Sequence, residues 1–427
     1  MHKRGIGNIF WLSGGITIDY YNKGNYNLQG FFTIFLVQIF KKEVIMRTVY
    51  LDNSATTKVR PEVLKQILDI NENYYGNPSS LHRMGLQIEM KIQEARKSAA
   101  KIINARPEEI YFTSGGTESN NIAIGGHIFN CEKKHNIITT NIEHPSVYNI
   151  FNNFKEKIEV RYVELDQMGR VVENSLEKLV DENTLLVSIM HVNNEIGIVQ
   201  DLNKIIRIIK EKNKSTKIHV DAVQSYGKIK IDLKALPIDT MSFSSHKIHG
   251  PKGVGGLYIR SGLNLSPVSF GGGQEKTIRP GTENTPGIVG FGEACELVTK
   301  DFKEEINKLY EIKNLYAKRL TEEINDIKIN SSLNEDGAPH ILNISFKKVR
   351  GEVLVHYLEQ KGIYVSTGSA CSSKSRNNRI LDAIQLDSSF MDGTIRISLG
   401  FYNNLDEVEY VVENIKQSVM DIRKIMK

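Results

Sequence analysis

Short apolar runs of strand length alternate with helical patterns along most of the chain, and this alternation constrains the fold most strongly. The runs cover residues 109–112, 136–140, 159–163, 185–190, 217–220, 240–244 and 256–259. Helical patterns lie between several of them, at residues 86–103, 118–129 and 202–212. Strands that alternate with helices predict a mainly parallel sheet with helices on both faces. The predicted fold class is therefore α/β.

The pattern changes after Gly292. A long charged amphipathic helix, a strand, a second helix and a closing strand are expected there, at residues 293–325, 340–346, 352–361 and 394–398. Such an order predicts a second, smaller α+β domain. We therefore predict a large domain over residues 61–292 and a small domain built from residues 46–60 and 293–427.

The first 45 residues differ from the rest. Their only sustained apolar run, Phe31–Phe40, has ten residues, whereas a membrane-spanning helix needs about 20. No signal-peptide cleavage site is evident, and a second methionine, Met46, stands directly before a predicted strand. We interpret residues 1–45 as a non-native or alternative translation start that is disordered. The alternative is an interfacial anchor built on the phenylalanines of this run, and N-terminal sequencing of the native protein distinguishes the two.

Charge and cysteine content limit the partners that we expect. The formal net charge is +5 over 427 residues, which is too small to indicate nucleic-acid binding. Cys131, Cys295 and Cys371 are far apart and form no CxxC pair. We therefore expect no disulfide framework and no standalone metal site, and a cytoplasmic location. Direct contact with nucleic acid or a membrane is not expected.

Three segments that follow predicted strands carry anion-binding or reactive groups. Residues 113–119 read Thr-Ser-Gly-Gly-Thr-Glu-Ser at a predicted helix start, where free backbone N–H groups bind anions. Asp221 ends a buried strand, where a carboxylate needs a cation. Lys247 precedes a glycine-rich turn, where partial desolvation makes an amine nucleophilic. Each alone has an ordinary interpretation, as a capped turn, a turn aspartate or a surface lysine.

Together the three segments are the parts that pyridoxal phosphate requires. An anion cradle binds the phosphate, a carboxylate keeps the pyridinium nitrogen protonated, and a lysine forms a Schiff base. The protonated ring then acts as the electron sink that stabilises a carbanion on the substrate. Lys247 is preferred to Lys252, because Lys252 lies inside the glycine-rich turn.

A series of motifs resembles, in order, those of the cysteine desulfurases (NifS/IscS-like), pyridoxal-phosphate enzymes of the class V aminotransferase group. The motifs are Leu51–Thr57, Thr113–Asn120, Glu143–Pro145, His191–Gly197, Asp221–Gln224, Ser244–Lys247, Arg279–Asn284, Ser369–Cys371 and Ile395–Ser398. The resemblance implies the fold type I of pyridoxal-phosphate-dependent transferases, with a large cofactor-binding domain and a smaller α+β domain. It covers the chain from Met46 almost to its last residue.

The resemblance also implies a role for individual residues. Lys247 resembles the Schiff-base lysine, and Asp221 resembles the partner of the pyridinium nitrogen. His144 resembles the residue that stacks on the cofactor ring and also moves protons. The remaining cofactor contacts that it implies are the phenolic-oxygen contacts of Gln224 and Asn194 and the phosphate contacts of Gly116, Thr117, Ser244 and His246.

The resemblance implies roles for two further residues, one in dimer formation and one in substrate binding. Thr282 resembles a residue that reaches the phosphate of the other subunit, which implies a homodimer. Arg396 resembles the clamp on the α-carboxylate of the substrate, with Asn194 beside it, a task that suits a planar guanidinium. The alternative interpretations are a core histidine at His246 and a surface ion pair at Arg396.

Cys371 resembles the catalytic cysteine. Its neighbours over residues 366–375 are small and polar, which predicts a mobile, exposed loop. Cys295 has apolar neighbours on a predicted helix, and we expect both Cys295 and Cys131 to be structural. Cys371 is expected to become a persulfide, and a further role as a transient iron–sulfur ligand stays open.

The activity that the resemblance implies is conversion of L-cysteine to L-alanine. Lys247 or His144 takes the α-proton, and Cys371 takes the sulfur and passes it to an acceptor protein. Iron–sulfur cluster assembly, tRNA thiolation and a dedicated client enzyme are the possible destinations. The alternatives are a selenocysteine lyase, a cysteine-sulfinate desulfinase and a non-catalytic regulatory subunit that holds the cofactor. The presence of Lys247, Cys371 and Arg396 argues against the regulatory subunit.

Overall fold

The computed structural model describes residues 47–129, 131, 134–368 and 378–426, together with the backbone of two short strands nearer the N-terminus. Those two strands, β1 (Trp11–Leu12) and β2 (Gly15–Ile16), pair antiparallel. The chain divides into two compact units, Met1–Arg47 and Thr48–Lys427. Our interpretation of residues 1–45 falls almost wholly outside the described residues and stays a prediction.

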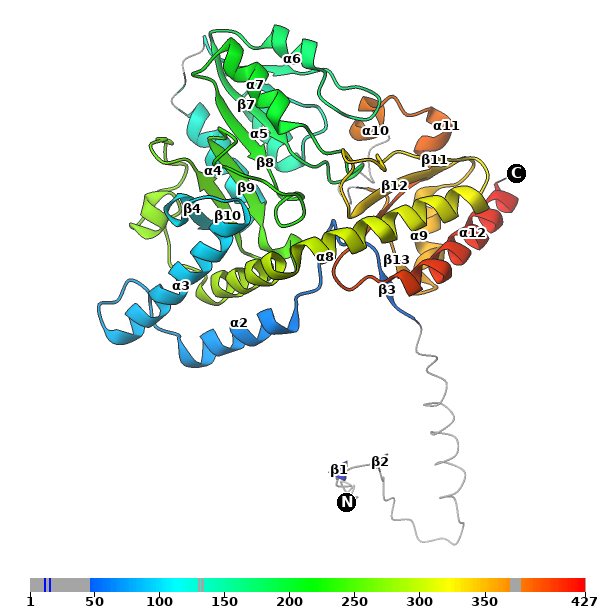
Figure 1. Ribbon diagram of the computed structural model, residues 1–427, viewed down its shortest axis with the longest axis horizontal. Coiled ribbons are helices and arrows are strands. Elements are labelled where there is room, and N and C mark those ends of the chain that lie inside the picture. The colour runs from blue at the N-terminus through cyan, green and yellow to red at the C-terminus, as the bar shows by residue number, and fades with distance from the viewer. Residues whose placement is uncertain are drawn as a thin grey trace, which may run out of the picture. The chain divides into compact units, whose positions relative to one another are not determined.

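A sheet of seven strands forms the centre of the second unit (Figure 1). In spatial order its strands are β4 (Ile110–Thr113), β10 (Gly255–Ile259), β9 (Thr240–Ser244), β8 (Lys217–Asp221), β7 (Thr184–Met190), β5 (Asn136–Thr139) and β6 (Glu159–Tyr162). Strands β9, β8, β7, β5 and β6 pair in parallel, and β10 runs antiparallel to both of its neighbours. The prediction of an α/β fold with a mainly parallel sheet is confirmed.

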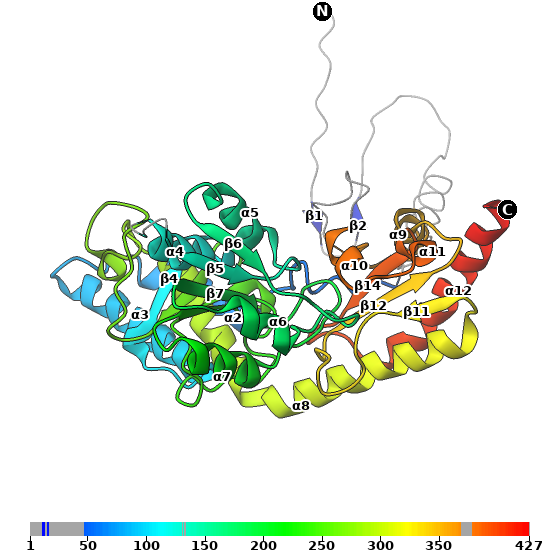
Figure 2. The same ribbon diagram turned by 90° about the horizontal axis from the view of Figure 1, so that it is seen from above.

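Both faces of this sheet are apolar, because consecutive residues of a strand point to opposite sides. Ile137 packs into one core and Ile138 into another, and Leu186 and Val187 divide in the same way. Helices α3, α6, α7 and α8 cover one face, and α4 and α5 cover the other (Figure 2). Their bounds are α3 (Arg83–Ile102), α4 (Gly116–Ile128), α5 (Pro145–Phe154), α6 (Glu173–Leu179), α7 (Leu202–Lys212) and α8 (Thr285–Glu323), and α2 (Pro61–Asn73) packs on α8.

A second, antiparallel sheet is built from the C-terminal part of the chain. Its strands are β11 (Ile327–Ile329), β12 (Ile341–Phe346) and β14 (Thr394–Ser398). Its core includes side chains of α8, α9 (Gly351–Glu359) and α12 (Val408–Ile425), and also of the short parallel pair β3 (Val49–Tyr50) and β13 (Ile363–Tyr364). The exact domain boundary that we predicted between residues 292 and 293 stays a prediction.

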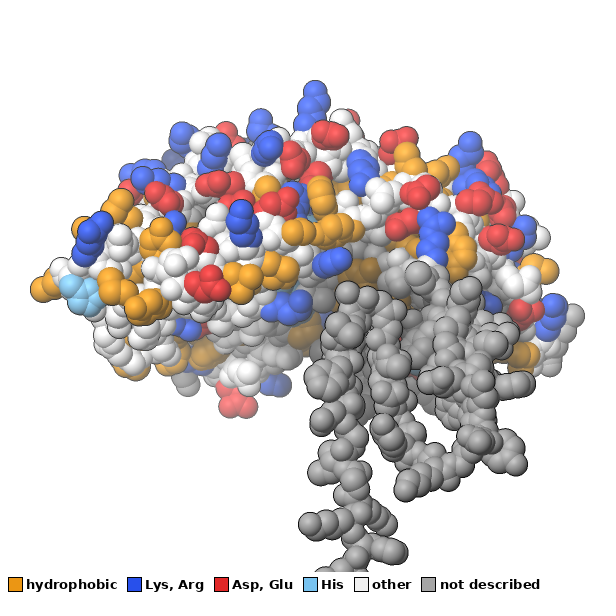
Figure 3. All heavy atoms as spheres, turned by 90° about the horizontal axis from the view of Figure 1, so that it is seen from below, with side chains coloured by type: hydrophobic (Ala, Val, Ile, Leu, Met, Phe, Trp, Pro, Cys, Tyr) orange, Lys and Arg blue, Asp and Glu red, His pale blue; other side chains and the backbone are white. Residues whose placement is uncertain are grey.

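Short elements complete the description. They are the helices α10 (Arg379–Ala383) and α11 (Ser388–Met391) and the 3₁₀ turns η1 (Pro107–Glu109), η2 (Ser245–Lys247), η3 (Gln274–Thr277) and η4 (Leu405–Glu407). Among the described residues, no helix combines the length and the apolar character that crossing a membrane requires. On the face drawn in Figure 3, basic and acidic side chains of the described residues are interspersed.

Helix α8 begins eight residues before the helix that we predicted from residue 293, because its first turns contain glycines that made them look like a loop. Asn284 caps the helix, with its side chain accepting a hydrogen bond from the N–H of Gly287. Gly292 lies where α8 crosses α3, and a Cβ atom at this position would lie 2.5 Å from the Cβ atom of Ala95. The glycine therefore permits the close packing of the two helices.

The Gly292→Ala substitution should lower the free energy of unfolding by about 1–3 kcal/mol, because the added methyl group overpacks the α3–α8 contact. Urea unfolding followed by circular dichroism measures this loss. Gly273→Ala is the matched control, since nothing lies within 4 Å of a Cβ atom there and its φ of −83° suits any residue. Equal effects of the two substitutions would contradict the close packing.

Candidate active site

Ten of the predicted site residues line one cavity of about 350 Å³. They are Gly116, Thr117, His144, Asn194, Asp221, Gln224, Ser244, His246, Lys247 and Arg396. Most of them follow the carboxyl ends of β4, β5, β7, β8 and β9, which meet at one edge of the parallel sheet. Ligand sites of open α/β sheets form at this edge.

One end of the cavity suits an anion. Gly116 and Thr117 form the first turn of α4, where backbone N–H groups have no partner within the helix. The buried hydroxyl oxygen of Ser244 has no hydrogen-bond partner among the described residues. A Cβ atom at Gly116 would lie 2.5 Å from Cγ2 of Val223, so only glycine fits there. These donors form a cradle for a phosphate group.

His246 lies beside this cradle, in the 3₁₀ turn η2. Its Nδ1 lies 3.2 Å from the Oγ1 atom of Thr56. Burial and, less strongly, the positive charge of Lys247 together lower the pKa of His246 to about 3. The imidazole is therefore neutral and acts here as a hydrogen-bonding group.

Asp221 supplies a buried carboxylate at the end of β8. Its Oδ1 accepts a hydrogen bond from the backbone N–H of Val223 at 3.0 Å, and its Oδ2 accepts one from Nδ2 of Asn120 at 3.0 Å. It has no ion pair within 4.0 Å in the described part of the chain. A buried carboxylate that has only neutral donors is suited to a protonated ring nitrogen on a ligand.

Lys247 faces the same cavity from η2. Its Nζ donates hydrogen bonds to the carbonyl oxygens of Ser54 and Ala55, the second at 2.8 Å. Burial and, less strongly, the positive charge of Arg396 lower the pKa of Lys247, Asp52 and Asp221 raise it, and the net pKa is about 8. A large fraction of the amine is therefore neutral and nucleophilic slightly above neutral pH.

His144 caps the N-terminus of α5 at the edge of the cavity. Its Nδ1 accepts a hydrogen bond from the backbone N–H of Ser146 at 3.1 Å and lies 2.8 Å from the Oγ atom of the same serine. The His144 side chain is exposed at the edge of the cavity, and desolvation by the surrounding protein lowers the pKa of the ring, which the negative charge of Asp221 partly opposes. The ring is therefore held by its Nδ1 side, and Nε2 remains for contact with a ligand.

The amide of Gln224 is oriented from two sides. Its Nε2 donates to the carbonyl oxygen of Ser54 at 3.0 Å, and its Oε1 lies 3.2 Å from Nε2 of His340. His340 is fully buried, which holds its pKa well below the ordinary value. We did not predict His340, because no local pattern distinguishes it from a core histidine.

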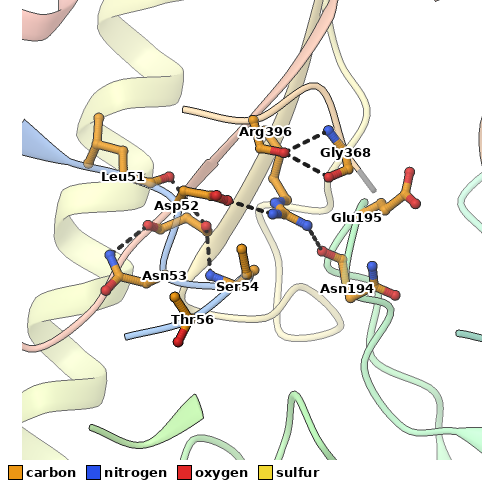
Figure 4. A network of polar contacts seen from close by, with 12 residues as sticks. Leu51, Asp52, Asn53, Ser54, Thr56, Asn194, Glu195, Gly368 and Arg396 are labelled. Atoms are coloured by element: carbon orange, nitrogen blue, oxygen red, sulfur yellow. Dashed lines mark hydrogen bonds and ion pairs between the residues drawn. The ribbon is translucent and has the colours of Figure 1, made fainter. Parts of the chain in front are cut away.

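Arg396 lies at the other end of the cavity, between Asp52 and Asn194 (Figure 4). Nη2 of Arg396, on β14, forms a 2.7 Å ion pair with Oδ1 of Asp52, and Nη1 donates to the carbonyl oxygen of Asn194 at 2.8 Å. Arg396 is 3% exposed, so it is not the surface ion-pair residue that we kept as an alternative. Asp52 lies in a motif that we quoted, but its role as the partner of Arg396 was missed.

Thr282 does not line the cavity and is exposed. It follows η3, in which Glu275, Lys276 and Thr277 have positive φ angles of 44°, 52° and 70°. The carboxylate of Glu275 holds this segment through two 2.8 Å hydrogen bonds from Arg96. The predicted contact of Thr282 with a second subunit therefore remains a prediction.

Cys371 lies outside the described residues, as do residues 369–375 of the mobile loop that we predicted around it. The described chain reaches the cavity at Gly368, three residues earlier. Gly368 has a φ of +115°, and a Cβ atom there would lie 2.8 Å from Oε2 of Glu195. Glycine is therefore required where the chain leaves the cavity.

The other two cysteines lie away from the cavity. Cys295 is fully buried, its Sγ atom lies 3.5 Å from the hydroxyl of Tyr226, and burial raises its pKa to about 12. Burial also raises the pKa of the Cys131 thiol. Both thiols are therefore unreactive at neutral pH, as expected of structural cysteines. The described residues contain no group of three or more His, Cys, Asp or Glu side chains placed to hold a metal ion.

A mainly parallel sheet with a polar cavity at its carboxyl edge is typical of an α/β enzyme, and comparison of the sequence with known protein families identifies the family. The family described as "Aminotransferase class-V" matches residues 49–411. The chain belongs to the class V aminotransferase family.

Similar proteins narrow this to one group within the family. "Cysteine desulfurase IscS" of Dictyoglomus turgidum is 40% identical over 383 residues, which are 89% of this chain and 96% of that protein. "Cysteine desulfurase IscS" of Methanosarcina thermophila is 41% identical over 89% of this chain and 94% of its own length. A solved structure described as a NifS-like protein is 41% identical, covers 88% of this chain and 100% of its own, and has a TM-score of 0.83. The resemblance to cysteine desulfurases is confirmed.

The pKa of Lys247 gives a testable consequence. In the cofactor-free protein, the rate of acylation of Lys247 should rise with pH through a midpoint near 8, because only the neutral amine reacts. The pKa of a lysine in a model peptide is about 10.4. Competitive labelling with acetic anhydride, read by mass spectrometry of the Lys247 peptide, measures the midpoint. Arg396→Gln should raise it, since the guanidinium charge lowers this pKa. A midpoint above 10 in the unaltered protein would contradict the assigned environment.

Proposed function

We propose that this chain is a cysteine desulfurase that converts L-cysteine to L-alanine and carries the released sulfur as a persulfide on Cys371. The observation that carries the proposal is the single cavity in which Lys247, Asp221, an anion cradle and Arg396 meet. The cysteine desulfurases at about 40% identity over most of the chain support the same activity.

The cavity residues fit pyridoxal phosphate. Gly116, Thr117, Ser244 and His246 would hold its phosphate, Asp221 its ring nitrogen and Gln224 its phenolic oxygen, and Lys247 would bind it covalently. The unpartnered hydroxyl of Ser244 and the neutral donors around Asp221 are the features that fit such a group. When bound, the cofactor supplies an electron sink for charge that develops on the substrate.

Arg396 and Asn194 would orient the substrate. The guanidinium carries the positive charge that an α-carboxylate requires, and Asp52 and the carbonyl oxygen of Asn194 fix its plane. Lys247, with its lowered pKa, would take the α-proton. Substrate orientation and proton transfer would thus both use groups that line the cavity.

Cys371 would complete the reaction. Its thiolate attacks the sulfur of bound cysteine, so that an S–S bond forms while the C–S bond breaks. The electron pair of the C–S bond stays on the substrate carbon, which is protonated and leaves as alanine. One cysteine and one enzyme thiol therefore give one alanine and one persulfide, and no external oxidant is required.

The assembly and the destination of the sulfur are also proposals. We infer a homodimer in which exposed Thr282 completes the phosphate site of the second subunit. The persulfide would pass to an acceptor protein of iron–sulfur cluster assembly or tRNA thiolation in the cytoplasm. A transient role of Cys371 as an iron–sulfur ligand belongs to the same proposal.

Cys371→Ala should retain the visible absorbance of the cofactor but lose alanine formation from cysteine by about 100-fold or more, because the nucleophile is removed. Alanine release with a reductant present measures this loss, and Cys131→Ala is the matched control. Full turnover of cysteine by the Cys371→Ala protein would contradict the assignment. Turnover of selenocysteine or cysteine sulfinate alone would favour the alternative activities.

Arg396→Lys should raise the KM for cysteine by about 10-fold or more, because an ammonium group cannot reproduce the planar fork that holds a carboxylate. Steady-state kinetics of alanine release measures KM and kcat separately. Arg319→Lys on the outer part of α8, where the arginine pairs with Glu323 and Glu409, is the control and should leave both values unchanged. An unchanged KM in Arg396→Lys would exclude Arg396 as the carboxylate clamp.

A further inference from the structure

Asn120 ends the glycine-containing motif at residues 113–120, but it does not line the cavity. It lies on α4 and is fully buried. Its side-chain amide contacts three groups that come from α5 and β8. Two of these contacts lead directly to groups at the cavity.

The orientation of the amide follows from its partners. Its Nδ2 lies 3.0 Å from the carboxylate oxygen Oδ2 of Asp221, which can only accept. Its Oδ1 lies 3.0 Å from Nε2 of His219. The reverse orientation would place an amide oxygen against the carboxylate, so the –NH₂ group must face Asp221.

His219 fixes this orientation from behind. Burial lowers its pKa to about 3, so the imidazole carries one proton. Nε2 donates that proton to Oδ1 of Asn120, and Nδ1 accepts from the hydroxyl of Thr240 at 2.9 Å. Each ring nitrogen therefore has a partner of the correct kind.

The second N–H of the amide reaches the other side of the cavity. Nδ2 of Asn120 donates to Oγ of Ser146 at 2.9 Å. The backbone N–H of Ser146 can only donate, and it points to Nδ1 of His144 at 3.1 Å, so this nitrogen is an acceptor. The Ser146 hydroxyl, which accepts from Asn120, therefore donates its own proton to the same Nδ1, 2.8 Å away. The proton of neutral His144 must then be on Nε2, the nitrogen that faces a ligand.

We propose that Asn120 is a positioning residue that holds the Asp221 carboxylate and, through Ser146, fixes His144 as the tautomer with its proton on Nε2. This inference rests on the proposed function. The inference deepens the proposed function by giving different roles to the two groups of the cavity that can carry a proton. His144 donates a hydrogen bond from Nε2, and Lys247 is the group that accepts the α-proton of the substrate.

Histidine tautomers have distinct ¹⁵N chemical shifts, which test the proposal without an activity assay. In protein labelled with ¹⁵N-histidine, the His144 signal, assigned from its loss in His144→Gln, should show the Nε2–H tautomer. Ser146→Ala should shift His144 toward a mixture of tautomers and leave cofactor affinity within about twofold, because Asp221 keeps its contact with Asn120. Asn120→Ala should change the tautomer and also weaken cofactor affinity about 10-fold, as expected for loss of a hydrogen bond to a charged group.

The matched control is Asn121→Ala. Asn121 is exposed, and its amide donates to a backbone oxygen within α4 at 2.9 Å, so neither readout should change. If Asn120→Ala does not fold, Ser146→Ala still tests the link to His144. An unchanged His144 signal in Ser146→Ala, or unchanged cofactor affinity in Asn120→Ala, would overturn the inference. If the unaltered protein binds no pyridoxal phosphate, the proposed function fails instead.

Discussion

Three charged side chains are buried around the cavity, and the surrounding structure must supply partners for each of them. Arg396 is balanced by Asp52, whereas Lys247 rests on main-chain oxygens and Asp221 is held by neutral donors. Buried charges are costly unless they are paired. A ligand that binds the Lys247 amine and brings a protonated nitrogen to Asp221 would remove both costs, as the proposed cofactor does.

The topology of the sheet makes this arrangement possible. Parallel strands end at one edge, so segments far apart in sequence, such as those carrying Thr117, Asn194 and Asp221, reach a common cavity. Helices on both faces bury the strands and exclude water from the polar groups behind the cavity. The network around Asn120 is an example, since it joins α4, α5 and β8 below the lining residues.

The sequence predicted the central sheet and the residues that line the cavity, but it did not predict the buried residues that hold those lining residues in place. Periodicity located the seven strands, and the ordered motifs located residues such as Lys247 and Asp221. The positioning residues Asn120 and His340 were missed, because their contacts depend on side-chain direction across elements more than 100 residues apart. Helix α8 was predicted too short, because a glycine needed for close packing looks in sequence like a glycine in a loop. No structural finding tests the predictions for Thr282 and Cys371.

The ion pair between Asp52 and Arg396 joins residues 344 positions apart. Asp52 is among the first residues of the folded unit to leave the ribosome, and Arg396 is among the last. A nascent chain can therefore contain all of the central sheet before it has the guanidinium that we propose as the carboxylate clamp. Contacts between such distant residues form late in folding. Because Arg396 lies on β14, near the end of the folded unit, the proposed carboxylate clamp is complete only after nearly all of this unit has been synthesised.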